Sequence, residues 1–330
     1  MNTLTIARTR GAVAECLHEV EAALVLPAGK LLAHYGDPGK YSYFRSSAKP
    51  IQALALFLSG AADHFGFTDA EIAIACASHF AEDFHLAAVR SILNKIGLSE
   101  AHLQCGASRS IKSEYAFAQA EAGVLPSAIQ SDCSGKHAAM LATCVLKGYP
   151  LDSYLEPAHP LQMQMLRIIS EVCAYPAVQI QIGIDGCGVP VFALPIFNMA
   201  LGFARFASPE YLPEIYQEPA MRIFRAMNAF PQNVSGTGGF CSELMRATGG
   251  RLIGKAGAMG VYAIGIKDQP LGLALKVKDG TPGISPVATM EILLRHQLIS
   301  DSEYEKLQHF HKPPILNTAG KQVGYITAEF

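Results

Sequence analysis

An SxxK sequence, Ser46 to Lys49, stands directly before an apolar segment and is the first group of residues whose types and spacing could do chemistry. A serine hydroxyl is a weak nucleophile until a base accepts its proton, and a lysine three residues later can lie one helical turn away. Pro50 disfavours helical angles at the preceding residue, so Lys49 can instead lie in the turn before the helix. Because SxxK also occurs by chance, a solvated loop lysine stays an alternative.

A second serine and a second lysine occur at the ends of predicted elements. Ser78 and His79 follow an apolar run that begins with a capping box at Thr68, so both side chains would be exposed at the tip of a helix. Lys255 stands at the edge of a predicted strand. Either position could be an ordinary element end, but together with the SxxK sequence they offer two serines and two lysines.

Two cysteines stand on short predicted loops. Cys133 opens a helix within Asp132–His137, and Cys187 follows a strand within Asp185–Gly188. Two thiolates could hold a zinc ion, with Lys136 or a histidine and a water completing a tetrahedron. Lysine is a rare ligand because its amine must first lose a proton from a reference pKa near ~10.4. Two small core thiols beside a helix-capping loop remain the alternative.

The balance of charges excludes several classes of partner. The chain has 26 basic and 28 acidic residues without a long run of either sign, so it lacks the electrostatic footprint of a protein that binds nucleic acid or an anionic membrane. The N-terminus has no apolar segment of signal-peptide length, and no stretch reaches the ~18 apolar residues of a spanning helix. Eight cysteines lack CxxC spacing and are expected to be reduced. We therefore expect a cytoplasmic protein whose ligands are small molecules.

The elements that must position the candidate residues are strands at both ends of the chain and helices between them. Strands are predicted at residues 12–16, 22–26, 31–35, 178–184, 252–255, 261–266, 271–277 and 322–326. Helices are predicted at residues 50–58, 69–78, 82–96, 135–147, 161–172 and 286–298, with a helical stretch from residue 191 to about residue 225. Residues 309–311 are assigned to a loop.

This pattern predicts an α+β fold with a mainly antiparallel sheet, formed from the N- and C-terminal segments, flanked by helices and joined to a helical lobe. A single domain would span residues 1–330, with a sheet lobe at roughly 1–45 and 250–330 and a helical middle at roughly 46–249. The sequence shows no internal repeat, linker or nucleotide-binding fingerprint.

Taken in order, these residues resemble the inducible rhizobial-type L-asparaginase family, also called asparaginase II. The resemblance covers nearly the whole chain and rests on Arg10-Gly11, Tyr35-Gly36-Asp37, Phe44-Arg45-Ser46, Lys49-Pro50-Ile51-Gln52-Ala53, Ala77-Ser78-His79, Cys133-Ser134-Gly135-Lys136-His137, Gly183 to Gly188, and Gly254-Lys255. It implies a fold similar to serine β-lactamases and glutaminases, a homodimer, and hydrolysis of L-asparagine to L-aspartate and ammonia.

The resemblance also implies roles for particular residues. It implies two serine-lysine tandems: Ser46 with Lys49, and Ser78 with Lys255. It implies a zinc ion among three ligands: Cys133, Lys136 and Cys187. Four further residues are candidates for binding the substrate: Arg45, His79, His137 and Asp185.

The expected mechanism begins with attack of one serine on the side-chain amide of asparagine. Ser46 is our first choice as nucleophile, although the two serines could exchange roles. Lys49 must be neutral to act as its base, and crowding by Lys255 would lower the Lys49 pKa in that direction. Ser78 would relay a proton to the departing ammonia. We expect the zinc ion to hold the substrate or shape the pocket rather than to generate hydroxide.

Three positions depart from the pattern that we expect of the family. Gly239 and Cys241 stand where an arginine and an aspartate are expected after Gly-Thr-Gly, and Asp132 stands where an asparagine is usual. These changes leave three other interpretations open: a glutaminase or another β-lactamase-like amidohydrolase, a catalytically inactive zinc-dependent amino-acid sensor, and a structural zinc protein.

Overall fold

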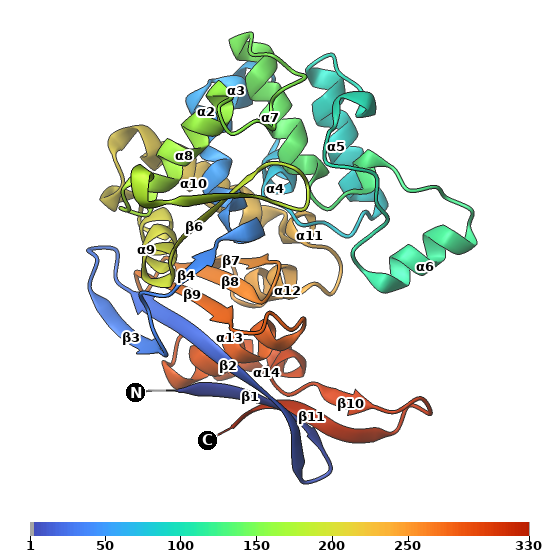
Figure 1. Ribbon diagram of the computed structural model, residues 1–330, viewed down its shortest axis with the longest axis vertical. Coiled ribbons are helices and arrows are strands. Elements are labelled where there is room, and N and C mark those ends of the chain that lie inside the picture. Colours follow the sequence, from blue (N-terminus) through green and yellow to red (C-terminus); the bar gives the residue numbers. More distant parts are fainter. Residues whose placement is uncertain (1–2, 330) are drawn as a thin grey trace.

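The main sheet joins the two ends of the chain. The computed structural model describes residues 3–329, and Figure 1 shows its helices and strands. Within those residues, eight antiparallel strands form this sheet in the order β10-β11-β1-β2-β9-β8-β7, with β3 paired to β2. Their bounds are β1 (Leu4–Arg10), β2 (Val13–Val25), β3 (Leu31–Tyr35), β7 (Leu252–Gly257), β8 (Val261–Ile266), β9 (Leu271–Val277), β10 (Pro314–Leu316) and β11 (Gln322–Glu329).

The predicted α+β class, with an antiparallel sheet built from both ends of the chain, is confirmed. Strands β1 and β11 lie side by side, with Ile6 opposite Ala328. The N-terminal details differ from the prediction, because β1 was not expected and β2 runs unbroken through the two segments predicted at 12–16 and 22–26. The first half of β2 is exposed and projects with β1 as a hairpin (Figure 1).

A second, smaller sheet lies in the middle of the chain. Its three strands run in the order β4 (Tyr41–Tyr43), β6 (Pro190–Pro195) and β5 (Gln181–Ile184). The prediction of a helix from residue 191 is therefore wrong at its start. All residues of β6 except Pro195 are buried, and a fully buried strand has a continuous apolar sequence that looks the same as a buried helix.

Helices make up most of the middle of the chain (Figure 1). Their bounds are α1 (Lys49–Gln52), α2 (Leu54–Leu58), α3 (Ala61–His64), α4 (Asp69–Ala75), α5 (Asp83–Lys95), α6 (Ser113–Glu121), α7 (Ser134–Lys147), α8 (Pro160–Val172), α9 (Ile196–Ala207), α10 (Glu214–Ala229), α11 (Pro231–Val234), α12 (Phe240–Ala247), α13 (Ile284–Arg295) and α14 (Asp301–His311). Across residues 3–329, no helix combines the length and the apolar character needed to cross a membrane.

Helix α9 fastens the helical part of the molecule to the sheet. It packs against β2, β8 and β9. Gly265 and Gly272, which pair across β8 and β9, make this close approach possible, because a side chain at either position would strike the α9 backbone. Helix α13 packs against β1, β8, β9 and β11. Since every residue of β8 is buried, helices cover the central strands on both faces and leave β7 at the edge of the sheet.

Several helices were not predicted from the sequence, α6, α12 and α14 among them. Helix α14 includes residues 309–311, so their assignment to a loop is wrong. A capping box starts this helix: Ser300 accepts a hydrogen bond from the Glu303 backbone N–H, and Glu303 accepts one from the Ser300 N–H at 2.8 Å. Helix α6 has no buried residue and projects from the body on two long connections (Figure 1).

Candidate active site

The SxxK sequence forms a tight turn rather than the first turn of a long helix. Residues Arg45–Ala48 are a short 3-10 helix, followed at once by α1. Arg45 has a φ of 51°, a left-handed backbone conformation that is uncommon and strained for a residue other than glycine. Ser47 donates a hydrogen bond to the Lys255 carbonyl at 3.0 Å. This bond fixes the turn to strand β7, which carries the second lysine.

Ser78 is the point at which the two lysines meet. The Lys49 Nζ lies 3.1 Å from the Ser78 Oγ, and the Lys255 Nζ lies 2.9 Å from the same oxygen. Both lysines are almost completely buried, and each also donates to a backbone carbonyl, Ala77 for Lys49 and Ala256 for Lys255. The geometry therefore gathers the two lysines on one hydroxyl, whereas the sequence predicted one lysine for each serine.

The surroundings of the two lysines shift their pKa values in opposite directions. Burial, with a smaller effect of the Lys49 charge, lowers the pKa of Lys255 to about 8. Burial also works against the charge on Lys49, but the negative charge of the Cys133–Cys187 pair and the Asp132 carboxylate favour it, and the balance raises the Lys49 pKa. The Asp132 Oδ2 lies 3.6 Å from the Lys49 Nζ. The expectation of a depressed Lys49 pKa is thus wrong, and Lys255 is the more readily neutral of the two lysines.

An ion pair joins the SxxK turn to the loop that carries Cys187. The Arg45 guanidinium contacts the Asp185 Oδ1 at 2.9 and 3.0 Å, and the Gly186 backbone N–H donates to the same oxygen at 2.8 Å. Both side chains are partly buried. The pair still has unused N–H donors and carboxylate lone pairs, so it could also bind the two charged groups of an amino acid.

The SxxK turn and the two cysteine loops line one pocket of about 410 Å³. Asp132 and Gly186 adjoin candidate residues in the chain, and five of the lining residues are candidate site residues themselves: Arg45, Ser46, Cys133, Asp185 and Cys187. Ser78 is not part of the lining, so Ser46 is the serine with open space beside it. A volume of this order suits a small molecule rather than a polymer.

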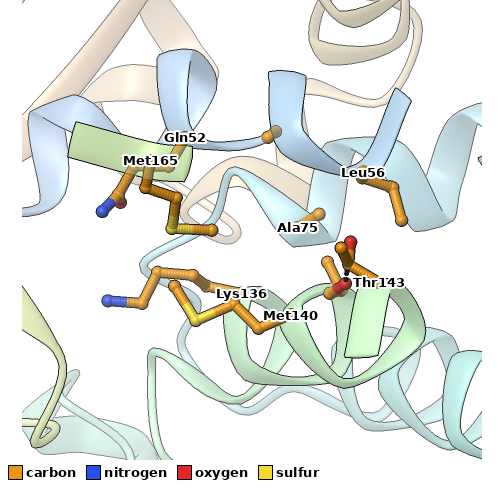
Figure 2. Close-up of a pocket in the computed structure, with 9 residues that line it drawn as sticks. Gln52, Leu56, Ala75, Lys136, Met140, Thr143 and Met165 are labelled. Carbon is orange, nitrogen blue, oxygen red and sulfur yellow. Dashed lines mark hydrogen bonds between the residues drawn. The ribbon is translucent and has the colours of Figure 1, made fainter. Parts of the chain in front are cut away.

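Cys133, Lys136 and Cys187 form a buried cluster, as predicted for a metal site. The Lys136 ammonium donates to the Cys187 sulfur at 3.2 Å. The neighbouring Cys133 and the Lys136 charge favour the thiolate form of Cys187 and lower the pKa of Cys187 far below its ordinary value. Figure 2 shows the Lys136 stem beside Met140 and Met165 on the lining of a small pocket of about 10 Å³.

The donor set of this cluster fits a zinc ion. Two sulfurs and an amine are ligands that zinc accepts, and the Lys136 ammonium supplies beside Cys187 the positive charge that a metal ion would supply. Within residues 3–329, no group of three or more histidine, cysteine, aspartate and glutamate side chains could hold a metal. A metal at the Cys133–Cys187 pair would therefore depend on the lysine.

The two histidines predicted to bind substrate are fully buried and absent from the pocket lining. His79 bonds through Nε2 to the Ser134 hydroxyl at 2.8 Å and through Nδ1 to the Ala81 N–H at 3.1 Å. Burial and the neighbouring His85 lower the pKa of His79 to about 3, so it is neutral. His137 bonds through Nδ1 to the Tyr154 hydroxyl. His79 thus joins the segment after Ser78 to α7, and His137 joins α7 to Tyr154, while their contact with substrate stays a prediction.

Sequence reasoning missed two contributors to the site. The segment before α6 forms one wall of the pocket, through Gly106–Ser108 and Ile111, and no chemical motif marks it. Cys241, which had been treated as a departure from the family, accepts a hydrogen bond from the Ala256 N–H at 3.2 Å. It therefore supports the backbone of β7 directly beside Lys255.

A serine hydroxyl between two buried lysines, beside a small pocket, is an arrangement that can catalyse acyl transfer from an amide or ester. The chain belongs to the L-asparaginase II family, whose model matches residues 6–328. This confirms the resemblance inferred from the motifs and makes the protein an amidohydrolase. No curated protein matches the chain.

Solved structures give more distant likenesses. A β-lactamase from Mycobacterium bovis is 14% identical with a TM-score of 0.41, over 85% of this chain and 95% of that one. A Bacillus glutaminase solved in 4.3 M NaCl is 12% identical with a TM-score of 0.33, over 88% of this chain and 89% of that one. At these TM-scores, neither likeness carries an argument about the substrate.

Proposed function

We propose that the protein hydrolyses L-asparagine to L-aspartate and ammonia by serine-lysine chemistry. The observation that carries the proposal is the Ser78 hydroxyl, 3.1 and 2.9 Å from two buried lysines of unequal pKa, next to a pocket with the paired charges of Arg45 and Asp185. Arg45 would bind the substrate's α-carboxylate and Asp185 its α-ammonium. The side-chain amide would then face Ser46, which lines the same pocket.

In the proposed reaction Ser46 is the nucleophile and Ser78 carries its proton. The Ser46 Oγ attacks the amide carbon, while its proton passes to the Ser78 Oγ and the Ser78 proton passes to neutral Lys255. Charged Lys49 donates to the Ser78 oxygen and stabilises negative charge there. The carbon–nitrogen bond breaks as Lys255 returns the proton to the leaving ammonia. A water then hydrolyses the Ser46 ester, which releases aspartate and restores both serines.

We also propose zinc as the resident metal, held by Cys133, Lys136 and Cys187. When bound, it would supply a fixed positive charge that shapes the pocket and attracts the polar groups of the substrate. Arg45, Asp185 and the two serines would carry out binding and proton transfer as described.

The test is ammonia release from L-asparagine and from L-glutamine, measured on zinc-loaded wild type, Ser46→Ala and Ser78→Ala. We expect asparagine turnover by the wild type, with both variants reduced by at least ~10³-fold because each removes a hydroxyl of one relay. Acyl-enzyme trapped on Ser46 in the wild type identifies the nucleophile by mass spectrometry. Folded, zinc-loaded wild type that releases no ammonia from asparagine would overturn the substrate proposal, and a label on Ser78 would reverse the serine roles.

We further propose that the protein is a homodimer. Exposed apolar side chains lie on both faces of the small sheet: Tyr41 and Tyr43 of β4 on one face, and Ile182 and Ile184 of β5 on the other, next to the loop that carries Asp185 and Cys187. Such a surface suits burial against another protein. Light scattering that gives the mass of one chain at micromolar concentration would exclude the dimer.

A further inference from the structure

We infer that Glu82 is a positioning residue that supports two parts of the site at once: the backbone that follows Ser78, and the pocket wall formed by residues 106–127, which we call the wall segment. The inference rests on the proposed function and adds how the pocket is kept in shape for the substrate. Glu82 is absent from the pocket lining, so it acts through the residues that it binds.

The wall segment has almost no core of its own. It contains α6, projects from the body (Figure 1), and is closed at its base by backbone hydrogen bonds between Ser108 and Ser127 at 3.2 and 3.3 Å. Ser110 is the one buried residue among residues 106–127, all of which the structure describes. Because buried apolar contacts do not hold this segment, its place beside the pocket depends on polar contacts with the rest of the protein.

Two side chains of the wall segment hydrogen-bond to the short stretch that follows Ser78. The Tyr115 hydroxyl donates to the Glu82 Oε2 at 3.1 Å, and the Ser110 hydroxyl donates to the Phe80 carbonyl at 2.5 Å. The bond to Glu82 is the one made to a charged group, and such bonds are the stronger kind. The pocket wall and the proposed proton relay therefore share one support.

Glu82 also fixes the Ser78 backbone to the glycine-rich loop before α12. It accepts hydrogen bonds from the Thr237 backbone N–H and the Thr237 hydroxyl, both at 2.8 Å. Just before that loop, the Val234 carbonyl accepts a hydrogen bond from the Ser78 backbone N–H at 2.9 Å. Gly236, with a φ of 141°, permits this close approach, because a side chain there would begin 2.7 Å from the Glu82 carboxylate. The backbone from Ser78 to Glu82 is thus attached at both ends.

The two roles of Glu82 can be separated by its partners. The Tyr115 hydroxyl holds the wall segment, which carries Ile111, the one large apolar side chain among the described residues that line the pocket. The Thr237 hydroxyl holds the Ser78 backbone, and the distances of 3.1 and 2.9 Å from the Ser78 oxygen to the two lysines depend on where that backbone lies. Loss of the first bond should therefore weaken substrate binding, and loss of the second should slow proton transfer.

The experiment measures kcat and KM for ammonia release from L-asparagine by zinc-loaded wild type, Tyr115→Phe, Thr237→Val and Glu82→Gln. Tyr115→Phe and Thr237→Val each remove one hydroxyl and keep the shape of the side chain. Amide hydrogen exchange of the wall segment is measured on the same proteins, because it reports how often the segment opens without depending on activity. Tyr304→Phe is the matched control, since its hydroxyl is also partly buried, lies 3.1 Å from the His311 Nδ1, and is absent from the pocket lining.

A hydrogen bond to a charged group is worth about tenfold or more in an equilibrium constant, and partial exposure reduces this effect. We expect Tyr115→Phe to raise KM by about 3–10-fold, to keep kcat within about twofold, and to speed exchange in the wall segment by about 3–10-fold. Thr237→Val should lower kcat by about 3–10-fold and keep KM within about twofold. Glu82→Gln should change both constants, and Tyr304→Phe should change neither.

A folded Tyr115→Phe whose KM and exchange match those of Tyr304→Phe would overturn the inference. Equal division of the effects between KM and kcat in Tyr115→Phe and Thr237→Val would also overturn it, because a general loss of order would affect both variants alike. If the wild type releases no ammonia from asparagine, the proposed substrate falls and exchange alone decides the inference. Faster exchange in the wall segment of Tyr115→Phe then supports it, and unchanged exchange overturns it.

Discussion

Lys255 and Ser78 meet through a hydrogen-bond distance of 2.9 Å, and Lys255 is the lysine whose pKa is lowered, by burial, to about 8. A general base works only in its neutral form, so activity should rise as pH increases through about 8 and then level off until Lys49 loses its charge at higher pH. We expect kcat/KM for asparagine to show this acid-side ionisation. A pH profile of zinc-loaded wild type measures it, and a profile that is flat from about pH 7 to 9 would contradict the assignment of Lys255.

Asp132 is expected to control the alkaline side of the same profile. In the proposed mechanism Lys49 must stay charged, and Asp132, 3.6 Å from its Nζ, favours that charge. Asp132→Asn should therefore lower the pKa of Lys49, and the alkaline limb of kcat/KM should move to lower pH. The control is Asp279→Asn, which removes a carboxylate that bonds to His18 far from the pocket. If both variants keep the alkaline limb of the wild type, Lys49 does not act as a cation.

Arg45 should matter for substrate affinity more than for chemistry. Its guanidinium holds Asp185, and we propose that it binds the α-carboxylate of the substrate. Hydrogen bonds to charged groups contribute ~1.5–3 kcal/mol, so Arg45→Met should raise KM by about 10–100-fold. Arg246→Met is the control, because Arg246 forms an exposed pair with Glu243 within one helix. A variant with unchanged KM and a lower kcat would instead mean that Arg45 acts on the strained turn before Ser46.

The sequence predicted the members of the site better than it predicted their contacts. Ser46, Cys133 and Cys187 line one pocket. Their motifs could be recognised in the sequence because each places a reactive side chain on a short loop. Which lysine contacts which serine depends on how η1 (Arg45–Ala48) docks against β7, and no local pattern encodes that docking. The burial of His79 and His137 could not be predicted for the same reason, since it depends on how distant segments pack and no local motif encodes it.

Fold prediction succeeded where burial alternates or caps are present and failed elsewhere. The capping box at Thr68 starts α4 as predicted, and β7 to β9 lie within one or two residues of their expected bounds. The capping box Ser300–Glu303 was an available signal for α14 that the prediction did not use. Strand β6, by contrast, is apolar throughout, and only its partners β4 and β5 distinguish it from a helix.

Removal of zinc should weaken substrate binding more than it lowers turnover. The proposed serine-lysine relay uses no atom of Cys133, Lys136 or Cys187, although both cysteines line the pocket. Chelator-treated protein should therefore show a KM for asparagine raised by about tenfold or more, with a smaller fall in kcat. Readdition of zinc should restore both. Abolished turnover with unchanged affinity would mean that the metal takes part in the chemical step, and loss of the folded state would indicate a structural zinc.

The burial of Lys255, on which the proposed activity depends, should lower the stability of the folded protein. Its folded-state pKa of about 8 lies below the ordinary 10.5, so folding disfavours its charged form. Below pH 8 the lysine is charged in both states and the whole penalty, ~3 kcal/mol, is present. Between pH 8 and 10.5 the folded protein has released the proton while the unfolded chain retains it, so this penalty is relieved as pH rises.

Lys255→Met should therefore be inactive yet more stable than the wild type at pH 7, by up to ~3 kcal/mol in free energy of unfolding. The advantage should shrink as pH rises toward 10. Urea denaturation of both proteins at several pH values measures this difference, with Lys321→Met, at an exposed position, as the control. If Lys255→Met is less stable than the wild type at pH 7, the ammonium is well solvated or paired in the folded protein, and Lys255 is not a base of lowered pKa.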